Sequence, residues 1–436
     1  MSTLLAILLF FVPGLVSSRL LRGFWDMPYA YVFSVLWLYA SIMAVEAFGV
    51  RLSLLSVGLL LGLLSFILLL MLYRLSEPSR PAATVSPFSN LKEVWPFLFG
   101  LFPAFFLTCL GVGNYIRAYR FPDHLFRWEL LPRQMFDLGN FRFYPPTVSE
   151  DFVSYFYVDS IPPLVQFQTY WIYEAFAQRV PAIATLHSTF TAFLCLSLVF
   201  RIVNARFSTT VALLSVLVFL SSYEVASTFA LVDASPLLIF ATLLIIEQSA
   251  VLKANKPTSR ETATLAIACA LAGLSRMYGL ILGAVVLLYL LLRRVPSKCL
   301  LVFVGVMVSF LAPWYFRTYL ITGNFFFPIE WYLGAPSNEL LIRIIEAYPI
   351  YNSQISLSQK LLASLPQMLL LSGVVIFAGL AGAALSKKGE LSLALLVTVA
   401  WLAIWFQHTS FSYGAFGHLK AITPAFAVFA VVAGPI

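Results

Sequence analysis

Charged side chains crowd the segment 117–160, which follows an apolar run that ends near residue 116. Asp123 comes seven residues after that run, in the sequence Phe-Pro-Asp-His. A carboxylate held at the edge of an apolar phase can accept the proton of a hydroxyl group. The pattern therefore favours Asp123 as a general base and Glu129 as a nearby substrate-binding residue. The alternative is a solvated loop whose acids and arginines pair with one another.

Two arginines and two acids stand within or at the ends of apolar runs, namely Arg276, Arg317, Glu224 and Asp233. An ionisable group at membrane depth is costly and usually faces a cavity or a partner. The planar guanidinium group can hold a phosphate through two hydrogen bonds. We therefore expect Arg276 and Arg317 to bind a phosphate, with Asp233 in the same site. The competing interpretation is an Arg–Asp pair that staples helices together.

His418 and Lys420 precede the last apolar run and are further candidates for holding an anionic group. A snorkelling lysine and an interfacial histidine explain them equally well. The sequence has no HExxH, CxxC or G-x-S-x-G motif and no glycine-rich phosphate loop. We therefore predict no metal site. The four cysteines all lie in apolar runs, and we interpret them as core residues.

The amino-acid composition indicates that these residues belong to a membrane-embedded protein. Of the 436 residues, 61% are hydrophobic and only 11% are charged. Soluble domains are about 45–50% apolar and about 25% charged, so a water-soluble enzyme, a disordered chain and a coiled coil are excluded. Continuous apolar runs disfavour a β-barrel. The sequence predicts an all-α polytopic membrane protein with about 11–13 transmembrane helices.

Apolar runs that we interpret as spans lie near 2–17, 28–48, 52–73, 94–116, 182–204, 208–223, 231–247, 262–277, 279–292, 299–317, 365–386, 391–407 and 419–435. Several of them are shorter than the roughly 20 residues that a perpendicular helix needs. The pairs 208–223/231–247 and 262–277/279–292 are therefore expected to be tight hairpins or tilted helices.

Loop charges indicate the orientation. With the N-terminus outside, the cytoplasmic loops hold 15 of the 27 basic residues and 6 of the 19 acidic ones. Basic loops favour the cytoplasm, which explains the net charge of +8 without nucleic acid. The long loops 117–181 and 318–364 are then outside, and the aromatic stretch 161–178 is expected to be an interfacial juxtamembrane helix. We expect N-terminal transmembrane helices with a cytoplasmic linker over 1–93 and a transmembrane catalytic module over 94–436.

Five stretches resemble the C-type membrane glycosyltransferases, a superfamily that includes protein O-mannosyltransferases and bacterial lipid A aminoarabinose transferases. They are FPDHLFRWELLPRQMFDLGNF around Asp123, Ile161-Pro-Pro-Leu-Val-Gln, Leu231-Val-Asp-Ala, Leu274-Ser-Arg-Met-Tyr-Gly-Leu and Pro313-Trp-Tyr-Phe-Arg-Thr-Tyr-Leu-Ile-Thr-Gly-Asn. The last is the most specific, because it looks like the family pattern P-W-x-x-R-N-x-x-x-T-G-N. The chain departs from the family in having Thr318 after the arginine and in lacking the doubly acidic motif of the mannosyltransferases.

The resemblance implies an inverting hexosyl- or pentosyltransferase in the bacterial plasma (inner) membrane, with its site facing outside. Its donor would be a polyprenyl-phosphate sugar and its acceptor a glycan, lipid or protein. The resemblance implies Asp123 as the base and Arg276, Arg317 and Lys420 as phosphate ligands. It identifies no cofactor with certainty and leaves dependence on a divalent metal open.

Two other functions are compatible with the same residues. A polysaccharide polymerase or ligase would also use outer-face arginines and lipid-linked glycans. A transporter or flippase would more often carry charges at the membrane midplane and inverted repeats. The charges of this sequence instead gather toward one face, and no repeat is visible in it.

Overall fold

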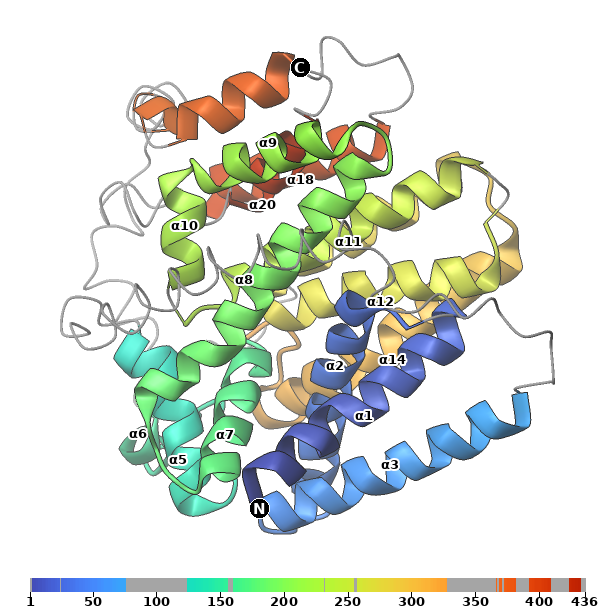
Figure 1. The fold of residues 1–436 in the computed structure, drawn as a ribbon. Helices are drawn as coiled ribbons and strands as arrows, with labels where there is room; N and C mark the ends of the chain where they lie inside the picture. Colours follow the sequence, from blue (N-terminus) through green and yellow to red (C-terminus); the bar gives the residue numbers. More distant parts are fainter. Residues whose placement is uncertain are drawn as a thin grey trace. The chain divides into compact units, whose positions relative to one another are not determined.

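The structure is a computed structural model that describes residues 2–23, 25–75, 124–155, 160–230, 232–254, 257–327, 366, 368–370, 372–381, 392–408 and 423–432. These residues form helices and no strand (Figure 1). Within these ranges, five helices are long and apolar enough to cross a membrane, or six if one bent pair counts as a single span. Shorter apolar helices accompany them. The predicted all-α polytopic membrane fold is confirmed, while the expected span 94–116 lies outside the described residues.

Two compact units divide the chain, and neither is contiguous in sequence. Unit 1 comprises Met1–Arg142 and Leu164–Ser197, and unit 2 comprises Phe143–Pro163 and Leu198–Ile436. The chain passes between them within α8 (Pro181–Asn204) and on both sides of the segment 143–163. The boundary that the sequence suggested at residue 93 lies outside the described residues.

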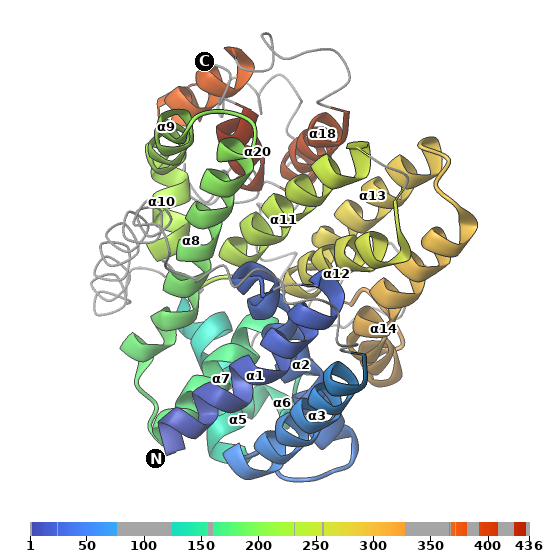
Figure 2. The same cartoon turned by 45° about the vertical axis from the view of Figure 1, so that its right-hand side comes forward.

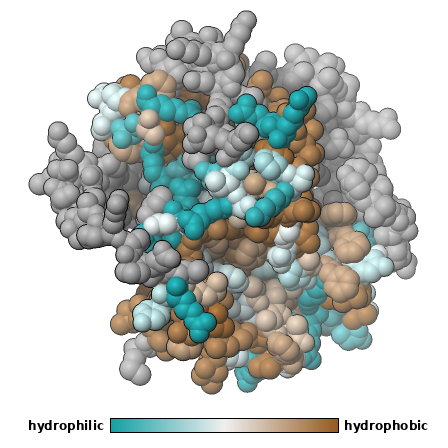
Figure 3. All heavy atoms as spheres, turned by 90° about the vertical axis from the view of Figure 1, so that its right-hand side faces the viewer, coloured by the Kyte–Doolittle hydropathy of each residue, from teal (hydrophilic) through white to brown (hydrophobic). Residues whose placement is uncertain are grey.

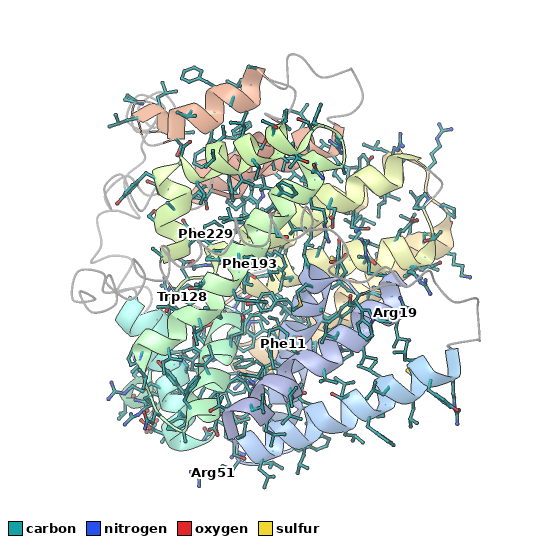
Figure 4. All side chains as sticks on the ribbon, in the orientation of Figure 1. Phe11, Arg19, Arg51, Trp128, Phe193 and Phe229 are labelled. Carbon is teal, nitrogen blue, oxygen red and sulfur yellow. The ribbon has the colours of Figure 1, made fainter. Side chains whose placement is uncertain are left out.

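Unit 1 begins with α1 (Ser2–Arg22), α2 (Met27–Ala47) and α3 (Leu54–Leu75). The helices α1 and α2 pack closely at Gly14. A Cβ atom there would lie 2.1 Å from the Ser34 hydroxyl oxygen and 2.2 Å from the Ala30 carbonyl oxygen. Only a residue without a side chain permits this approach. Figure 4 labels Phe11 among these helices, where its ring lies 5.6 Å from that of Phe190.

Helix α7 (Leu164–Phe176) is the buried centre of unit 1. It packs against α1, α2 and α5 (Leu130–Leu138), and ten of its thirteen residues are buried. The Tyr31 hydroxyl donates a hydrogen bond of 2.7 Å to Oε1 of Gln168. The sequence predicted this segment as an interfacial juxtamembrane helix, and its position relative to the membrane stays a prediction. Within unit 1 the helix is buried, because its aromatic rings pack and its amides form hydrogen bonds inside the unit.

Glu174, near the end of α7, binds the first residue of α3. Its Oε2 atom accepts a hydrogen bond of 2.8 Å from the backbone N–H of Leu54. Burial raises the pKa of Glu174, and the Leu54 hydrogen bond, the Tyr170 hydroxyl and the Arg51 guanidinium oppose that rise. A carboxylate at the N-terminus of a helix also interacts favourably with the positive end of the helix dipole. Arg51 is labelled at the lower edge of the view in Figure 4.

Unit 2 contains a sharp turn between two helices. The span predicted over 208–223 corresponds to α9 (Thr209–Leu220), and α10 (Tyr223–Ala230), a helix that the sequence did not predict, leaves it at 75°. Ser222 explains the turn. Its hydroxyl accepts a hydrogen bond of 3.3 Å from the Val225 N–H at the start of α10, and lies 2.7 Å from the Ser372 hydroxyl.

The core of unit 2 is built on α11 (Ser235–Ala254), α12 (Ser259–Ser275), α13 (Leu280–Leu292) and α14 (Ser297–Thr322). At one end of α12 and α14, the Cys299 thiol donates to the Pro257 carbonyl at 3.4 Å. At the other end, the Tyr315 hydroxyl donates to the Gly273 carbonyl at 2.9 Å. The two helices therefore run parallel, and α13 carries the chain back between their ends (Figures 1 and 2).

The helix Ser372–Ala381 and two further C-terminal helices complete the described part of unit 2. Helix α18 (Ser392–His408) packs on α13, and α20 (Thr423–Val432) packs on α11. The Trp401 indole N–H donates to the Thr242 hydroxyl at 3.2 Å, which ties α18 to α11. Cys195, Cys269 and Cys299 are buried free thiols, as the sequence predicted, whereas Cys109 lies outside the described residues.

Candidate functional site

Arg276 stands at the break between α12 and α13. Its backbone is extended, with φ −153°, so it ends α12 before a short 3₁₀ turn, η3 (Met277–Gly279), begins. The turn folds tightly back on α12. A Cβ on Gly279 would lie 2.1 Å from the Ala272 carbonyl oxygen, so this position requires glycine. The predicted placement of Arg276 between two hairpin helices is confirmed.

Asp233 fixes the start of α11 and faces Arg276. Its Oδ1 atom accepts hydrogen bonds from the Ser235 backbone N–H at 2.7 Å and from the Ser235 hydroxyl at 2.8 Å. The same oxygen lies 3.8 Å from Nη2 of Arg276, and the two side chains are 5% and 18% exposed. Asp233 is therefore the helix cap that positions the arginine.

Arg317 lies on α14, five residues before the helix ends. Its Nη1 atom donates a hydrogen bond of 2.5 Å to the Tyr144 carbonyl. The guanidinium carbon lies 5.7 Å from the centre of the Trp314 ring, and the Tyr144 ring stacks on the same indole at 5.7 Å. The carbonyl and the indole together fix the direction in which the guanidinium points.

The two arginines occupy corresponding ends of parallel helices. The hydrogen bond from Tyr315 to Gly273 joins α14 two residues before Arg317 to α12 three residues before Arg276. Both guanidinium groups therefore belong to the same end of the α12–α14 pair, where Asp233 also lies. Two fixed cations at one end of a membrane bundle can bind an anionic group such as a phosphate.

Glu129 belongs to unit 1. It ends the π-helix η2 (His124–Glu129), is 8% exposed, and its Oε2 atom accepts a hydrogen bond of 2.5 Å from the Tyr173 hydroxyl. Trp128 beside it is also buried, and is labelled in Figure 4. The substrate-binding role suggested for Glu129 stays a prediction.

Three other predicted site residues, Asp123, His418 and Lys420, lie outside the described residues. In the parts of the chain that the structure describes, no group of three or more His, Cys, Asp or Glu side chains could hold a metal ion.

Tyr144 and Trp314 are the residues that the sequence did not single out. Tyr144 precedes Pro145, and its hydroxyl donates to the Ile161 carbonyl at 2.7 Å, which anchors the segment 143–163. Its partner Arg317 is 173 positions away, so no local pattern could pair them. Trp314 belongs to the P-W-x-x-R stretch. It stands one helical turn before the arginine, and this spacing indicates that the two side chains lie on the same face of the helix.

No family model matches this sequence, and neither does any curated protein. Among solved structures, the chain is similar to the aminoarabinose transferase ArnT from Cupriavidus metallidurans, in its crystal structure bound to undecaprenyl phosphate. The TM-score is 0.54 and the sequence identity 16%, over 78% of this chain and 60% of ArnT. The apo structure of ArnT gives a TM-score of 0.50 at 16% identity, over 70% of this chain and 54% of ArnT.

The chain thus spans about three fifths of the length of the relative that it resembles. The similarity at this level of identity concerns the fold. The chain has a polytopic helical fold similar to that of ArnT.

Proposed function

We propose that this protein is a membrane glycosyltransferase that moves a sugar from a polyprenyl-phosphate donor to a hydroxyl acceptor at the extracytoplasmic face. The observation that carries the proposal is the pair Arg276 and Arg317, held at the same end of the parallel helices α12 and α14. The fold supports it, because a relative with this fold has been crystallised with undecaprenyl phosphate.

The arginines would bind the phosphate that links the sugar to the lipid. The Tyr144 carbonyl holds the Arg317 guanidinium group in a fixed direction, and the Asp233 carboxylate, 3.8 Å from Nη2 of Arg276, attracts the other guanidinium group through its charge. Fixed donors stabilise a developing negative charge without reorganising, which is the largest single contribution in many enzymes. As the bond between the anomeric carbon and the phosphate oxygen breaks, the charge of the departing polyprenyl phosphate would grow at this position.

Asp123 would act on the acceptor. Its carboxylate takes the hydroxyl proton while the hydroxyl oxygen attacks the anomeric carbon from the side opposite the phosphate. The new glycosidic bond forms as the bond to phosphate breaks, so the configuration at the anomeric carbon inverts. The products are the glycosylated acceptor, the polyprenyl phosphate and protonated Asp123.

The test is donor-lipid binding by full-length protein in nanodiscs, titrated with undecaprenyl phosphate. Arg317→Lys keeps the charge but loses the fork that grips phosphate. A lost charge-assisted hydrogen bond is worth about 1.5–3 kcal/mol, so binding should weaken at least about tenfold. Arg276→Lys should weaken binding to a smaller degree. The matched control is Arg201→Lys, because Arg201 also pairs with a carboxylate, that of Glu247 at 2.5 Å.

One outcome would overturn the assignment of the arginines. If Arg276→Lys and Arg317→Lys bind the lipid as the parent does but unfold at lower temperature, both arginines are structural. The phosphate site would then have to be sought at His418 and Lys420.

The general base is tested by turnover. Asp123→Asn keeps the size of the side chain and removes the proton acceptor, so turnover should fall about 10²–10⁴-fold with donor binding unchanged. Asp151→Asn is the control, because Asp151 accepts backbone hydrogen bonds from Thr147 at 3.0 Å and Val148 at 3.2 Å. Full activity in Asp123→Asn would move the role to another carboxylate, such as Asp137.

A further inference from the structure

The end of α12, α13 and α14 that lies away from Arg276 and Arg317 carries four exposed basic residues. We call it the basic end, and its members are Arg260, Arg293, Arg294 and Lys298. They gather because α12 and α14 start side by side, with the Ser259 hydroxyl 3.9 Å from the Cys299 thiol, and because α13 ends there. In the described ranges, none of the four forms an ion pair with an acidic side chain.

The basic end contains a single carboxylate, and that carboxylate is already bound. Glu261 is the only acidic residue of the sequence 257–300. Its Oε2 atom accepts hydrogen bonds from the Thr258 backbone N–H at 2.7 Å and from the Thr258 hydroxyl at 3.0 Å, which completes the capping box of α12. Among the residues that the structure describes, the four cations therefore have little compensation from acidic side chains.

The helix ends at this position also favour an anion. Because α12 and α14 are parallel, both present their N-termini, and with them the positive ends of their dipoles. Arg260 and Lys298 sit in those first turns, where the dipoles oppose a cation. Helix α14 begins at Pro296 without a side-chain cap, so its first N–H groups have no side-chain acceptor from that residue.

Arg294 occupies a backbone position that favours glycine. Its φ is +52°, and it closes α13 through hydrogen bonds from its own N–H to the Leu291 carbonyl at 2.9 Å and from Val295 to the Leu290 carbonyl at 3.1 Å. Glycine is the usual residue at such a helix end, because a side chain in the left-handed region is strained. An arginine here places charge at the basic end against that local preference.

Exposed leucines lie next to the basic end on α13 and α14 and form an apolar surface there. Leu288, Leu291 and Leu292 on α13 and Leu301 on α14 are 50%, 51%, 68% and 74% exposed. Figure 3 views this side of the molecule and shows hydrophilic residues gathered next to hydrophobic ones. A cationic cluster beside an apolar, lipid-facing surface matches a molecule with an anionic head and hydrocarbon chains.

We propose that the basic end binds an anionic phospholipid of the surrounding bilayer, with its phosphate among Arg260, Arg293, Arg294 and Lys298 and its acyl chains along the exposed leucines of α13 and α14. The site is separate from the proposed donor site, and the inference does not depend on the proposed function.

The experiment is a lipid titration of the full-length protein, read by native mass spectrometry with phosphatidylglycerol and, separately, phosphatidylcholine. The parent should bind phosphatidylglycerol at least about tenfold more tightly, since only that lipid is anionic. Each charge removed should weaken binding about fivefold, so Arg293→Gln with Lys298→Gln should weaken it about 25-fold. The control is Arg133→Gln, which removes an exposed cation on α5 and should bind as the parent does.

Arg294→Gly separates binding from folding. It should weaken phosphatidylglycerol binding about fivefold, while the temperature of unfolding without lipid stays equal or rises, because glycine relieves the positive φ. Arg294→Lys should bind nearly as the parent does.

Four results would overturn the proposal. The first is equal binding of the two lipids by the parent. The second is parent-like binding by both Arg294→Gly and the double variant. The third is an equal loss of binding in Arg133→Gln. The fourth is binding of soluble glycerol 3-phosphate as tight as that of phosphatidylglycerol, which would indicate a site for free phosphate esters rather than for a lipid.

Discussion

The Oδ1 atom of Asp233 lies 3.8 Å from Nη2 of Arg276 while it accepts two hydrogen bonds from Ser235. That separation is longer than a hydrogen bond, which needs about 2.7–3.2 Å between nitrogen and oxygen. This carboxylate oxygen is thus hydrogen-bonded to Ser235 at the start of α11, and it acts on the arginine mainly through its charge. This relationship makes the electrostatic and structural roles of Asp233 separable.

Asp233→Asn should keep the helix cap and remove the charge. The amide oxygen can still accept from Ser235, so the temperature of unfolding should change little. If Arg276 binds the donor phosphate, the variant should bind undecaprenyl phosphate several-fold more tightly, because the phosphate no longer competes with a carboxylate for the guanidinium group. Weaker lipid binding together with early unfolding would instead identify the pair as a structural staple. Both quantities are measured in the nanodisc titration and by thermal unfolding.

The orientation of the chain can be tested by labelling. The excess of basic residues in one set of loops predicts Ser259 on the cytoplasmic side and Ser353 outside. Cysteines introduced singly at these positions should react with an impermeant maleimide from opposite sides of sealed vesicles. Labelling of both cysteines from the same side would contradict this topology, and with it the proposal that the site faces the extracytoplasmic side.

The close packing of α1 and α2 predicts a strong effect at Gly14. The Cβ of Gly14→Ala would overlap the Ser34 hydroxyl and the Ala30 carbonyl, at 2.1 and 2.2 Å. Overpacking of this kind typically costs about 1–3 kcal/mol. The matched control is Gly305→Ala on α14, whose added Cβ would meet nothing within 4 Å. There the higher helix propensity of alanine should leave stability unchanged or raise it. Equal thermal unfolding of the two variants would contradict the packing argument.

Glu174 predicts a pH dependence of stability. Burial, the largest effect on this side chain, raises the pKa of Glu174 in the folded state. Between the ordinary pKa of a glutamate and this raised value, the folded state binds more protons than the unfolded state. Protonation of Glu174 therefore stabilises the folded state. This stabilisation is fully present below the ordinary pKa of a glutamate and is lost as the pH rises through the pKa of Glu174 in the folded state.

Glu174→Gln removes this titration and keeps an oxygen for the Leu54 N–H. The temperature of unfolding of the parent should fall, relative to that of the Gln variant, as the pH rises through this window. Parallel curves for the two proteins would show that Glu174 titrates alike in the folded and unfolded states.

Much of this architecture could be predicted from the sequence, because the strongest features were local. Apolar runs, caps and charges gave the helices, the hairpin at Arg276 and the position of Asp233 at the start of α11. The helix α10 was missed, since the Ser222 hydroxyl that accepts a hydrogen bond at its start looks like any serine in an apolar run. The burial of α7 was missed for a different reason. Its glutamines indicated an interface, and only their partners, such as Tyr31, show that they bond inside the unit.

The hydrogen bond between Arg317 and Tyr144 also constrains how the protein is made. Tyr144 belongs to a segment of unit 2 that is synthesised before unit 1 is complete, and its partner follows 173 residues later. At translation rates of about 5–20 residues per second, the segment waits about 10–35 s for α14 to emerge. During that interval, the Tyr144 ring, which lies 5.0 Å from the Tyr155 ring in the finished fold, has no Trp314 to stack against. The two contacts that fix the direction of Arg317 therefore cannot both form until α14 has been synthesised.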